Sequence, residues 1–323
     1  MCPDFSVILT TRNRPELFEI ALKSVLMQED ISLEVVVVND GSSEDFLPAY
    51  HALEKTYKDN TRFIYLIPSM GGHGQSYAIN QGALHASGTY IALLDDDDYW
   101  TDPQHLARAK HAFAAEDDTF SIYCALQEAW LRDKKLTHPI WLDKNLDTLI
   151  KTPAKIEDVY YAKRADVIKN GVFSQVNTLI FTRDLFMQIK GFDEHILYEG
   201  DREFFIRLID QVEHILFLNK YVSKHHVPDQ AKTDNFSTSV KRIGKLQCQL
   251  TLYSKLMLES RTEDVRYEAK LGYGYTLKHL TEQLAMQGNL SAARYYAWIA
   301  LASQFSFKWL GYSLYLSVKS LFK

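Results

Sequence analysis

Short apolar runs alternate with segments of helical spacing over the first hundred residues. The runs 5–10, 33–38, 62–67 and 90–94 are short and largely apolar, and the first is rich in β-branched residues, which predicts four strands. Helical spacing after Pro15, and again over 44–55 and 76–86, predicts helices between them. This alternation predicts an α/β fold, a doubly wound, mostly parallel sheet with helices on both faces. In such sheets ligands bind beyond the carboxyl ends of the strands.

The pattern is less regular in the middle of the chain and purely helical at its end. It predicts a helix over 106–115, strands over 121–130 and 177–182, and the start of a helix over 204–209, whereas 131–170 shows little periodicity. From about residue 240 only helical spacing remains, over 246–258, 267–287 and 290–303. We therefore predict a main domain over 1–240 and a helical region over 241–323.

The last stretch, 305–323, is apolar and aromatic, and its only charges are Lys308, Lys319 and Lys323. Two interpretations have similar weight. Such a helix lies on a membrane surface with its apolar face among the lipid headgroups, or it docks on the helices before it. No run of about 18 apolar residues occurs, so no membrane span is predicted.

Composition narrows the class of protein. The 323 residues carry a net charge of −5 and 46% of them are hydrophobic, which is ordinary for a globular protein. Without a strongly basic surface, nucleic acid is not expected as a partner. Three widely spaced cysteines indicate neither a disulfide framework nor a zinc site. The first residues lack a signal-peptide pattern, so we expect a cytoplasmic location.

The strongest chemical signal is the run of four aspartates at 95–98, directly after a predicted strand. Side by side these carboxylates repel one another, and a divalent cation such as Mg²⁺ or Mn²⁺ removes that repulsion. Mg²⁺ takes only one or two protein carboxylates and fills its shell with phosphate oxygens, so the run predicts a metal that holds a diphosphate. The alternative is a solvated acidic turn that caps the helix after Pro103.

Further polar residues lie at the same predicted edge of the sheet. Asp40 follows the second strand, where it either hydrogen-bonds a base or ribose or caps the next helix. The loop 71–74, which contains Gly72 and precedes a helix with Asn80, either lets the backbone approach a ligand or forms a plain turn. Neither the P-loop pattern nor GxGxxG after the first strand occurs, which removes support for those nucleotide-binding folds.

Two later segments supply an acid–base group and ring nitrogens. Asp201 lies in an acidic loop that enters a helix, where a carboxylate either acts as a general base or complements the helix dipole. His225 and His226 follow an apolar segment, and they either add a nitrogen ligand to the metal or are structural.

In this order the segments resemble the family 2 glycosyltransferases, which have the GT-A fold. Residues 7–14 (VILTTRNR) are similar to the opening motif of that family, 36–42 (VVVNDGS) to its VVDDGS element, and 88–98 (GTYIALLDDDD) to its strand with the DxD motif. The resemblance covers about residues 5–240. It implies transfer of a sugar from a nucleotide-sugar donor, most often a UDP-sugar, to a hydroxyl of a glycan or lipid-linked acceptor, with inversion by a single displacement. Synthesis of a surface polysaccharide is the setting it suggests.

The resemblance also implies roles for residues. Asp201 is the implied base, although the family has a Glu-Asp pair where this chain has Gly200 and Asp201. The implied cofactor is Mn²⁺ or Mg²⁺ held by Asp95, Asp97 and His226, with His225 as the less favoured histidine. Nine residues are expected to contact the nucleotide, and two of them come from the glycine-rich loop and the helix after it. They are Thr10, Thr11, Arg12, Arg14, Asp40, Gly72, Asn80, Asp95 and Asp96.

Two rival classes stay open beside this interpretation. A nucleotidyltransferase normally carries a glycine-rich basic loop directly after its first strand, and residues 12–15 contain no glycine. A non-catalytic protein built on the same fold, with the C-terminal helices as its partner surface, is disfavoured by the presence of Asp201 and His226. Only the transferase releases a nucleoside diphosphate from the donor.

Overall fold

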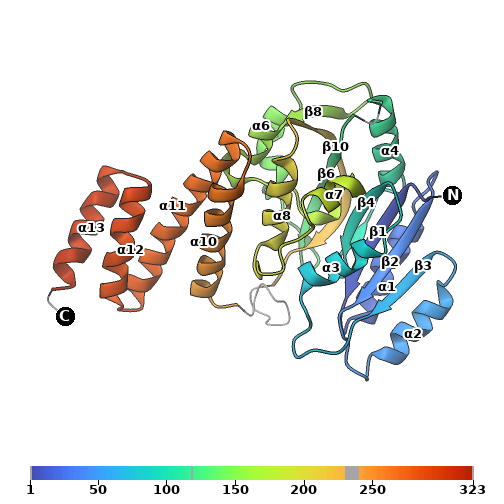
Figure 1. Cartoon of the computed structure of the whole chain (residues 1–323), viewed down its shortest axis with the longest axis horizontal. Helices are drawn as coiled ribbons and strands as arrows, with labels where there is room; N and C mark the ends of the chain where they lie inside the picture. The colour runs from blue at the N-terminus through green and yellow to red at the C-terminus, as the bar shows by residue number, and fades with distance from the viewer. Residues whose placement is uncertain (1, 118, 230–239, 322–323) are drawn as a thin grey trace. The chain divides into compact units, whose positions relative to one another are not determined.

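The computed structural model describes residues 2–117, 119–229 and 240–321 (Figure 1). The chain forms two compact units, Met1–Asp229 and Gln230–Lys323. In the described residues the first unit mixes strands with helices, and the second contains helices alone.

Four parallel strands form the first part of the sheet, in the order β3-β2-β1-β4. They are β1 (Phe5–Thr11), β2 (Leu33–Asn39), β3 (Thr61–Tyr65) and β4 (Tyr90–Asp95), joined by the helices α1 (Pro15–Leu26), α2 (Leu47–Thr56) and α3 (Gln75–Leu84). Each lies on a segment predicted from its spacing. Helix α2 begins three residues later than predicted, because Pro48 sets its first turn.

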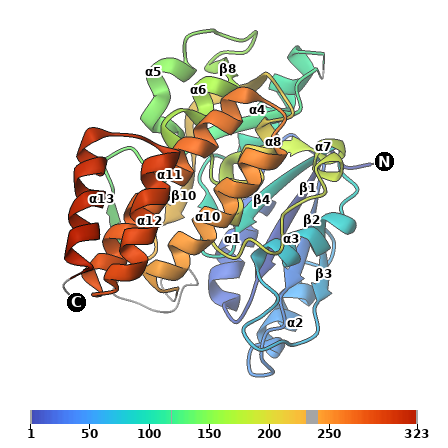
Figure 2. The same cartoon turned by 60° about the vertical axis from the view of Figure 1, so that its left-hand side comes forward.

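Helices cover both faces of these strands, which explains why the strands read as continuous apolar runs. Phe5, Val7 and Leu9 of β1 belong to a core that also includes buried residues of α1 and α4 (His105–Ala115). Ile8 points to the opposite face, where a Cβ added to Gly82 of α3 would lie 2.6 Å from its side chain. Figure 2 shows α3 beside β1 and β2.

The second part of the sheet contains a reversed strand. Strand β9 (Leu179–Thr182) runs antiparallel to β4 and to β6 (Ile122–Leu131), and β10 (His214–His226) runs parallel to β6. The edge strands β5 (Tyr99–Trp100), β7 (Lys134–Lys135) and β8 (Val159–Lys163) pair antiparallel with β10 or β6. The predicted α/β fold with a mostly parallel sheet is therefore confirmed.

Short elements occupy the segment 131–170, for which no regular structure was predicted. Besides β7 and β8 they include η1 (Leu142–Asn145), α5 (Leu146–Leu149), α6 (Arg164–Ile168) and η2 (Lys169–Gly171). Elements of two to five residues are too short to show a period. Further on, the turn η3 (Val176–Thr178) takes the first residues of the predicted strand 177–182, α7 (Arg183–Gln188) follows β9, and α8 (Gly200–Ile209) begins four residues before the predicted 204.

The second unit consists of successive helices, each packed against the next. They are α10 (Arg242–Glu259), α11 (Glu263–Met286), α12 (Leu290–Ser303) and α13 (Phe307–Lys319). One face of α13 docks on α12: Leu316 is buried, and Trp309 Nε1 donates to Ala297 O at 3.0 Å. On its other face Phe307 is 82% exposed and Val318 is 56% exposed. Within the described ranges, no helix combines the length and the apolar character that a bilayer crossing requires.

Candidate active site

The carboxyl ends of β1, β2 and β4 bring predicted polar residues to one edge of the sheet. Thr10 of β1 lies opposite Asp95 of β4, and Asp40 directly follows β2. After Asp95 the chain turns tightly, with Asp98 N donating to Asp95 O at 3.2 Å, and then enters β5. The turn keeps the four carboxylates of residues 95–98 close together.

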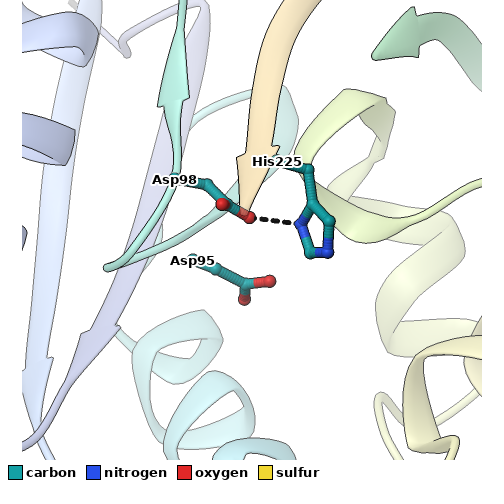
Figure 3. Close-up of side chains that lie close together, drawn as sticks. All are labelled: Asp95, Asp98 and His225. Carbon is teal, nitrogen blue, oxygen red and sulfur yellow. Dashed lines mark hydrogen bonds and ion pairs between the residues drawn. The ribbon is translucent and has the colours of Figure 1, made fainter. Parts of the chain in front are cut away.

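Asp95, Asp98 and His225 form a compact cluster at this turn (Figure 3). His225 Nδ1 lies 2.5 Å from Asp98 Oδ2, and one ligand atom of each residue lies within 4.8 Å of the other two. His225 arrives from the end of β10, which pairs with β5. Carboxylates suit Mg²⁺ and Mn²⁺, and imidazole is the commonest nitrogen ligand of bound metals. The donor atoms present therefore fit the implied ion.

Burial and mutual charge make these groups titrate very differently. Burial, together with the charges of Asp98 and Asp97, raises the pKa of Asp95 to about 8. Burial acts in the same direction on Asp98, but the charge and hydrogen bond of His225 hold the pKa of Asp98 far below its usual range. Burial would lower the pKa of His225, yet Asp98 raises it to about 9. Additional positive charge at this edge would stabilise the ionised carboxylates.

Two amides that the sequence analysis did not identify orient the carboxylates. Gln175 Nε2 donates to Asp95 Oδ2 at 2.8 Å, and Asn177 Nδ2 donates to Asp98 Oδ2 at 2.6 Å. Both lie at or just before η3, ahead of β9. Because β9 runs against β4, the segment that precedes it reaches the edge at which β4 ends. Gln175 stands 80 residues from Asp95, so no local spacing relates them in the sequence.

Arg14 binds two of the four carboxylates. Its guanidinium lies 2.8 Å from Asp96 Oδ1 and 2.9 Å from Asp97 Oδ2. Burial lowers the pKa of Arg14, but the charges of Asp96 and Asp97 raise it overall. Burial raises the pKa of Asp96 to about 7, against the opposing charge of Arg14. Arg14 thus forms ion pairs with both Asp96, which is a predicted nucleotide contact like Arg14 itself, and Asp97, the predicted metal ligand.

The two histidines occupy different positions. The His225 side chain is 16% exposed and belongs to the cluster. The His226 side chain is 37% exposed, and its Nδ1 lies 2.6 Å from Asp97 O. Its backbone N–H donates to Asp98 Oδ1 at 2.7 Å. The structure therefore brings His225 into the cluster, whereas the sequence analysis favoured His226.

Asp40 holds the glycine-rich loop. Its carboxylate accepts hydrogen bonds from His73 N at 2.9 Å and from Gly74 N at 3.0 Å, and His73 Nδ1 lies 2.8 Å from Oδ1. Gly72 has φ +82°, and a Cβ there would lie 2.5 Å from Asp40 Oδ2. Glycine is needed at this position for both its backbone angle and its lack of a side chain.

Arg12 lies beside this loop, because the same Cβ at Gly72 would lie 3.0 Å from Arg12 Cδ. Its Nε is buried and has no hydrogen-bond partner among the described residues. A buried donor without a partner is costly and points to a ligand or water. Thr11, by contrast, is buried and bonds Tyr50 OH at 2.7 Å. Its hydroxyl thus has a partner within the fold.

Asn80 positions a different loop. Its Nδ2 donates to Phe192 O at 3.0 Å and to Glu194 Oε1 at 2.8 Å, and its Oδ1 accepts from Phe192 N at 2.9 Å. These bonds hold the chain ahead of α8. The predicted nucleotide contact at Asn80 thus coincides with a loop-fixing role.

Asp201 lies in the first turn of α8 and is half-buried. Burial raises its pKa, its bond from the Arg202 backbone opposes the rise, and the positive charge of His225 also opposes it. Asp201 therefore lies within the electrostatic reach of the cluster. Helix α8 is anchored by the ion pair of buried Glu203 with Arg207, at 2.6 Å.

Comparisons with known proteins identify the family of this chain. The family model described as glycosyl transferase family 2 matches residues 6–183. One relative is a GalNAc(5)-diNAcBac-PP-undecaprenol beta-1,3-glucosyltransferase of Campylobacter jejuni, 38% identical over 96 residues, which are 30% of either chain. The chain thus spans less than a third of the length of that relative. Another is a glucosyl-dolichyl phosphate glucuronosyltransferase of Haloferax volcanii, 22% identical over 71% of each chain.

Solved structures share the fold. A mannosyltransferase of Pyrobaculum calidifontis, in complex with GDP-Man and Mn²⁺, has a TM-score of 0.62 at 19% identity and covers 100% of this chain and 82% of that one. TarS of S. aureus, residues 1–349 with UDP-GlcNAc, has a TM-score of 0.67 at 17% identity and covers 92% and 79%. From the family match over more than half of its length, this chain belongs to glycosyl transferase family 2, and the likeness to solved structures shows the GT-A fold.

Proposed function

We propose that this glycosyltransferase moves a sugar from a nucleotide-sugar donor to a hydroxyl of a glycan or lipid-linked acceptor, with inversion and with a divalent metal. The observation that carries the metal requirement is the cluster of Asp95, Asp98 and His225 at the carboxyl edge of the sheet. UDP is the favoured nucleotide. An undecaprenol-linked glycan, the kind of substrate in the name of the Campylobacter jejuni relative, supports a role in surface polysaccharide synthesis.

Mn²⁺ or Mg²⁺ would be held by Asp95 and His225 of the cluster, together with Asp97, the ligand that the family resemblance names. Asp97 would exchange its ion pair with Arg14 for the ion. Asp98 already accepts bonds from His225, from Asn177 and from the His226 backbone, so it serves mainly to orient His225. His226, named by the family resemblance, is the competing ligand. When bound, the ion supplies charge that stabilises the leaving diphosphate.

The nucleotide would lie along the edge formed by β1, β2 and the 71–74 loop. Arg12 has an unpartnered buried donor for an anionic or carbonyl oxygen, and Thr10 adds a hydroxyl. Asp40 would accept from a base or ribose after exchanging its bonds to His73 and Gly74. Gly72 keeps this approach open.

Asp201 would act as the general base. The acceptor oxygen forms a bond to the anomeric carbon while the bond from that carbon to the diphosphate oxygen breaks. Asp201 takes the hydroxyl proton, and its raised pKa increases its basicity for that step. A single displacement of this kind inverts the anomeric centre.

Release of nucleoside diphosphate tests the proposal. The full chain is incubated with a panel of UDP-, GDP- and dTDP-sugars in Mn²⁺, Mg²⁺ or EDTA. We expect slow release from one donor that EDTA abolishes, with NMR of the product establishing the anomeric configuration. Absence of both release and metal-dependent nucleotide binding would contradict the proposal.

A further inference from the structure

A cavity lies in the first unit, and none of the predicted nucleotide residues is among those that line it. Its volume is about 370 Å³, within the range of roughly 300–1,000 Å³ that holds small ligands. It opens among the end of β6, strand β7, the loop into η1, and β10. Residues that line it and carry the argument are Gln127, Lys135, Trp141, Asp143 and Tyr221.

This cavity shares a wall with the metal cluster. The ring of Trp141 meets the ring of His225 edge-on, with centroids 5.1 Å apart and an interplanar angle of 88°. Gln127 and Trp141 also line a small void of about 10 Å³. Gln175, which bonds Asp95, lines the same void. A molecule in the large cavity would therefore sit next to the groups that hold the metal.

Gln127 supplies an unsatisfied amide. The residue is 5% exposed, and neither its Oε1 nor its Nε2 has a hydrogen-bond partner among the described residues. Leaving a buried donor and a buried acceptor unpaired is unfavourable, because neither atom regains the hydrogen bond that it made to water. A ligand that both donates and accepts, as a hydroxyl does, would satisfy the two atoms together.

The other walls favour a neutral ring over a charged group. Lys135 is paired with Glu128 at 2.5 Å, and Asp143 Oδ1 accepts from the backbone N–H of Trp141 at 2.9 Å. These charges are already engaged, so a diphosphate finds no free cation among them. Tyr221, which is 47% exposed, and Trp141 provide aromatic surface for the apolar face of a sugar.

We propose that this cavity is the acceptor subsite, which binds a neutral, hydroxyl-bearing sugar ring beside the metal cluster. Gln127 binds its hydroxyls, and Trp141 and Tyr221 pack against its ring. This inference rests on the proposed function, because it names where the acceptor of the transfer reaction binds.

Direct binding tests the assignment without knowledge of the natural acceptor. Saturation-transfer NMR measures affinity for a panel of methyl glycosides of glucose, galactose, mannose and N-acetylglucosamine, with UDP and Mn²⁺ present. The variants are Gln127→Met and Tyr221→Ala, and the matched control is Gln188→Met on the exposed side of α7. Because the Gln127 amide is unpartnered, Gln127→Met should keep the wild-type melting temperature.

We expect at least one glycoside to bind the wild type and to lose about tenfold in affinity in both variants, the effect of one or two lost hydrogen bonds or contacts. UDP affinity should be unchanged. Unchanged glycoside affinity in both variants, or a wild type that binds no glycoside of the panel, would overturn the acceptor assignment. If the wild type showed no metal-dependent UDP binding, that result would instead count against the proposed function.

Discussion

At the scale of single residues, neighbouring carboxylates of the acidic turn have opposite titration behaviour. Asp95 is a weak acid with a pKa of about 8, whereas Asp98 stays ionised through its bonds to His225 and the His226 backbone. The difference comes from which partner each side chain reaches, since all belong to one short turn. The two adjacent histidines differ for the same reason.

That difference makes the histidines a matched pair of variants. In His225→Gln we expect Mn²⁺-dependent UDP affinity to fall at least about tenfold, because a nitrogen of the cluster is lost. In His226→Gln most of that affinity should remain, because the His226 Nδ1 lies 3.4 Å from Asp98 Oδ1 but His226 does not belong to the three-residue cluster. Calorimetric titration with UDP, with and without Mn²⁺, measures both. The opposite ranking would return the ligand role to His226.

Asp201→Asn should lower the transfer rate by about 10²–10⁴, the usual contribution of a general base. Asparagine keeps the shape of the side chain but cannot accept the proton at neutral pH. Nucleotide binding with Mn²⁺ should be unaffected. The readout is the single-turnover rate with saturating donor and acceptor, and a wild-type rate in this variant would exclude Asp201 as the base.

His105, outside the site, should make stability depend on pH. It is fully buried between Trp100 and Tyr123, and burial lowers its pKa from 6.5 to about 4. Between these values only the unfolded chain takes up the proton, so stability is intact above pH 6.5 and falls as the pH decreases toward 4. The loss from pH 7 to pH 5 amounts to roughly 2 kcal/mol.

Replacing this imidazole by an apolar side chain should remove that part of the acid sensitivity. We expect the urea midpoint of His105→Leu to change less between pH 7 and pH 5 than that of the wild type. His111→Leu, at an exposed position of the same helix, is the control, and its urea midpoint should change with pH as much as that of the wild type. An equal change of the urea midpoint between pH 7 and pH 5 in all three proteins would show that His105 does not titrate as described.

At the scale of elements, the glycine-rich loop offers a test with a matched position. Gly71 and Gly72 have nearly equal φ values of +88° and +82°, but a Cβ meets nothing within 4 Å at Gly71 and lies 2.5 Å from Asp40 at Gly72. Both alanine variants pay the same backbone strain, about 1 kcal/mol. We expect the UDP affinity of Gly72→Ala to be at least about tenfold lower than that of Gly71→Ala. Equal UDP affinities in the two variants would show that Gly72 does not belong to the nucleotide site.

Elements were predictable where burial imposed a period. Strands β1 to β4 and the helices between them follow from apolar spacing, and the acidic turn follows because it directly succeeds β4. The orienting amides Gln175 and Asn177 were not predictable, because a reversed strand delivers them from about 80 residues away. The short elements of 131–170 were missed as well, and they include walls of the large cavity.

At the scale of the whole molecule, the exposed face of the last two helices suggests contact with an anionic bilayer. Among the exposed apolar side chains there, Phe305 is 61% and Phe307 is 82% exposed. From residue 283 to the end the sequence has no acidic residue, and its charges are Arg294, Lys308, Lys319 and Lys323. Aromatic residues beside basic ones favour the interface of negatively charged lipids.

We therefore expect the full chain to sediment with vesicles of phosphatidylglycerol and phosphatidylcholine, and less with phosphatidylcholine alone. Phe305→Ser with Phe307→Ser should reduce the bound fraction several-fold, because exposed aromatic area is lost. Tyr267→Ser, at a 61% exposed position of α11, is the control. If all variants sedimented equally with the vesicles, this face would not be a membrane contact.

The reversed strand and the late strand β10 also determine when the site comes into being. Strands β1 to β4 pair within the first 95 residues, whereas His225 meets Asp98 across 127 residues of chain. Closing the longer loop costs more chain entropy and is slower than local pairing. The nucleotide edge can therefore assemble during synthesis well before the cluster of Asp95, Asp98 and His225, which is complete only when His225 has joined the sheet.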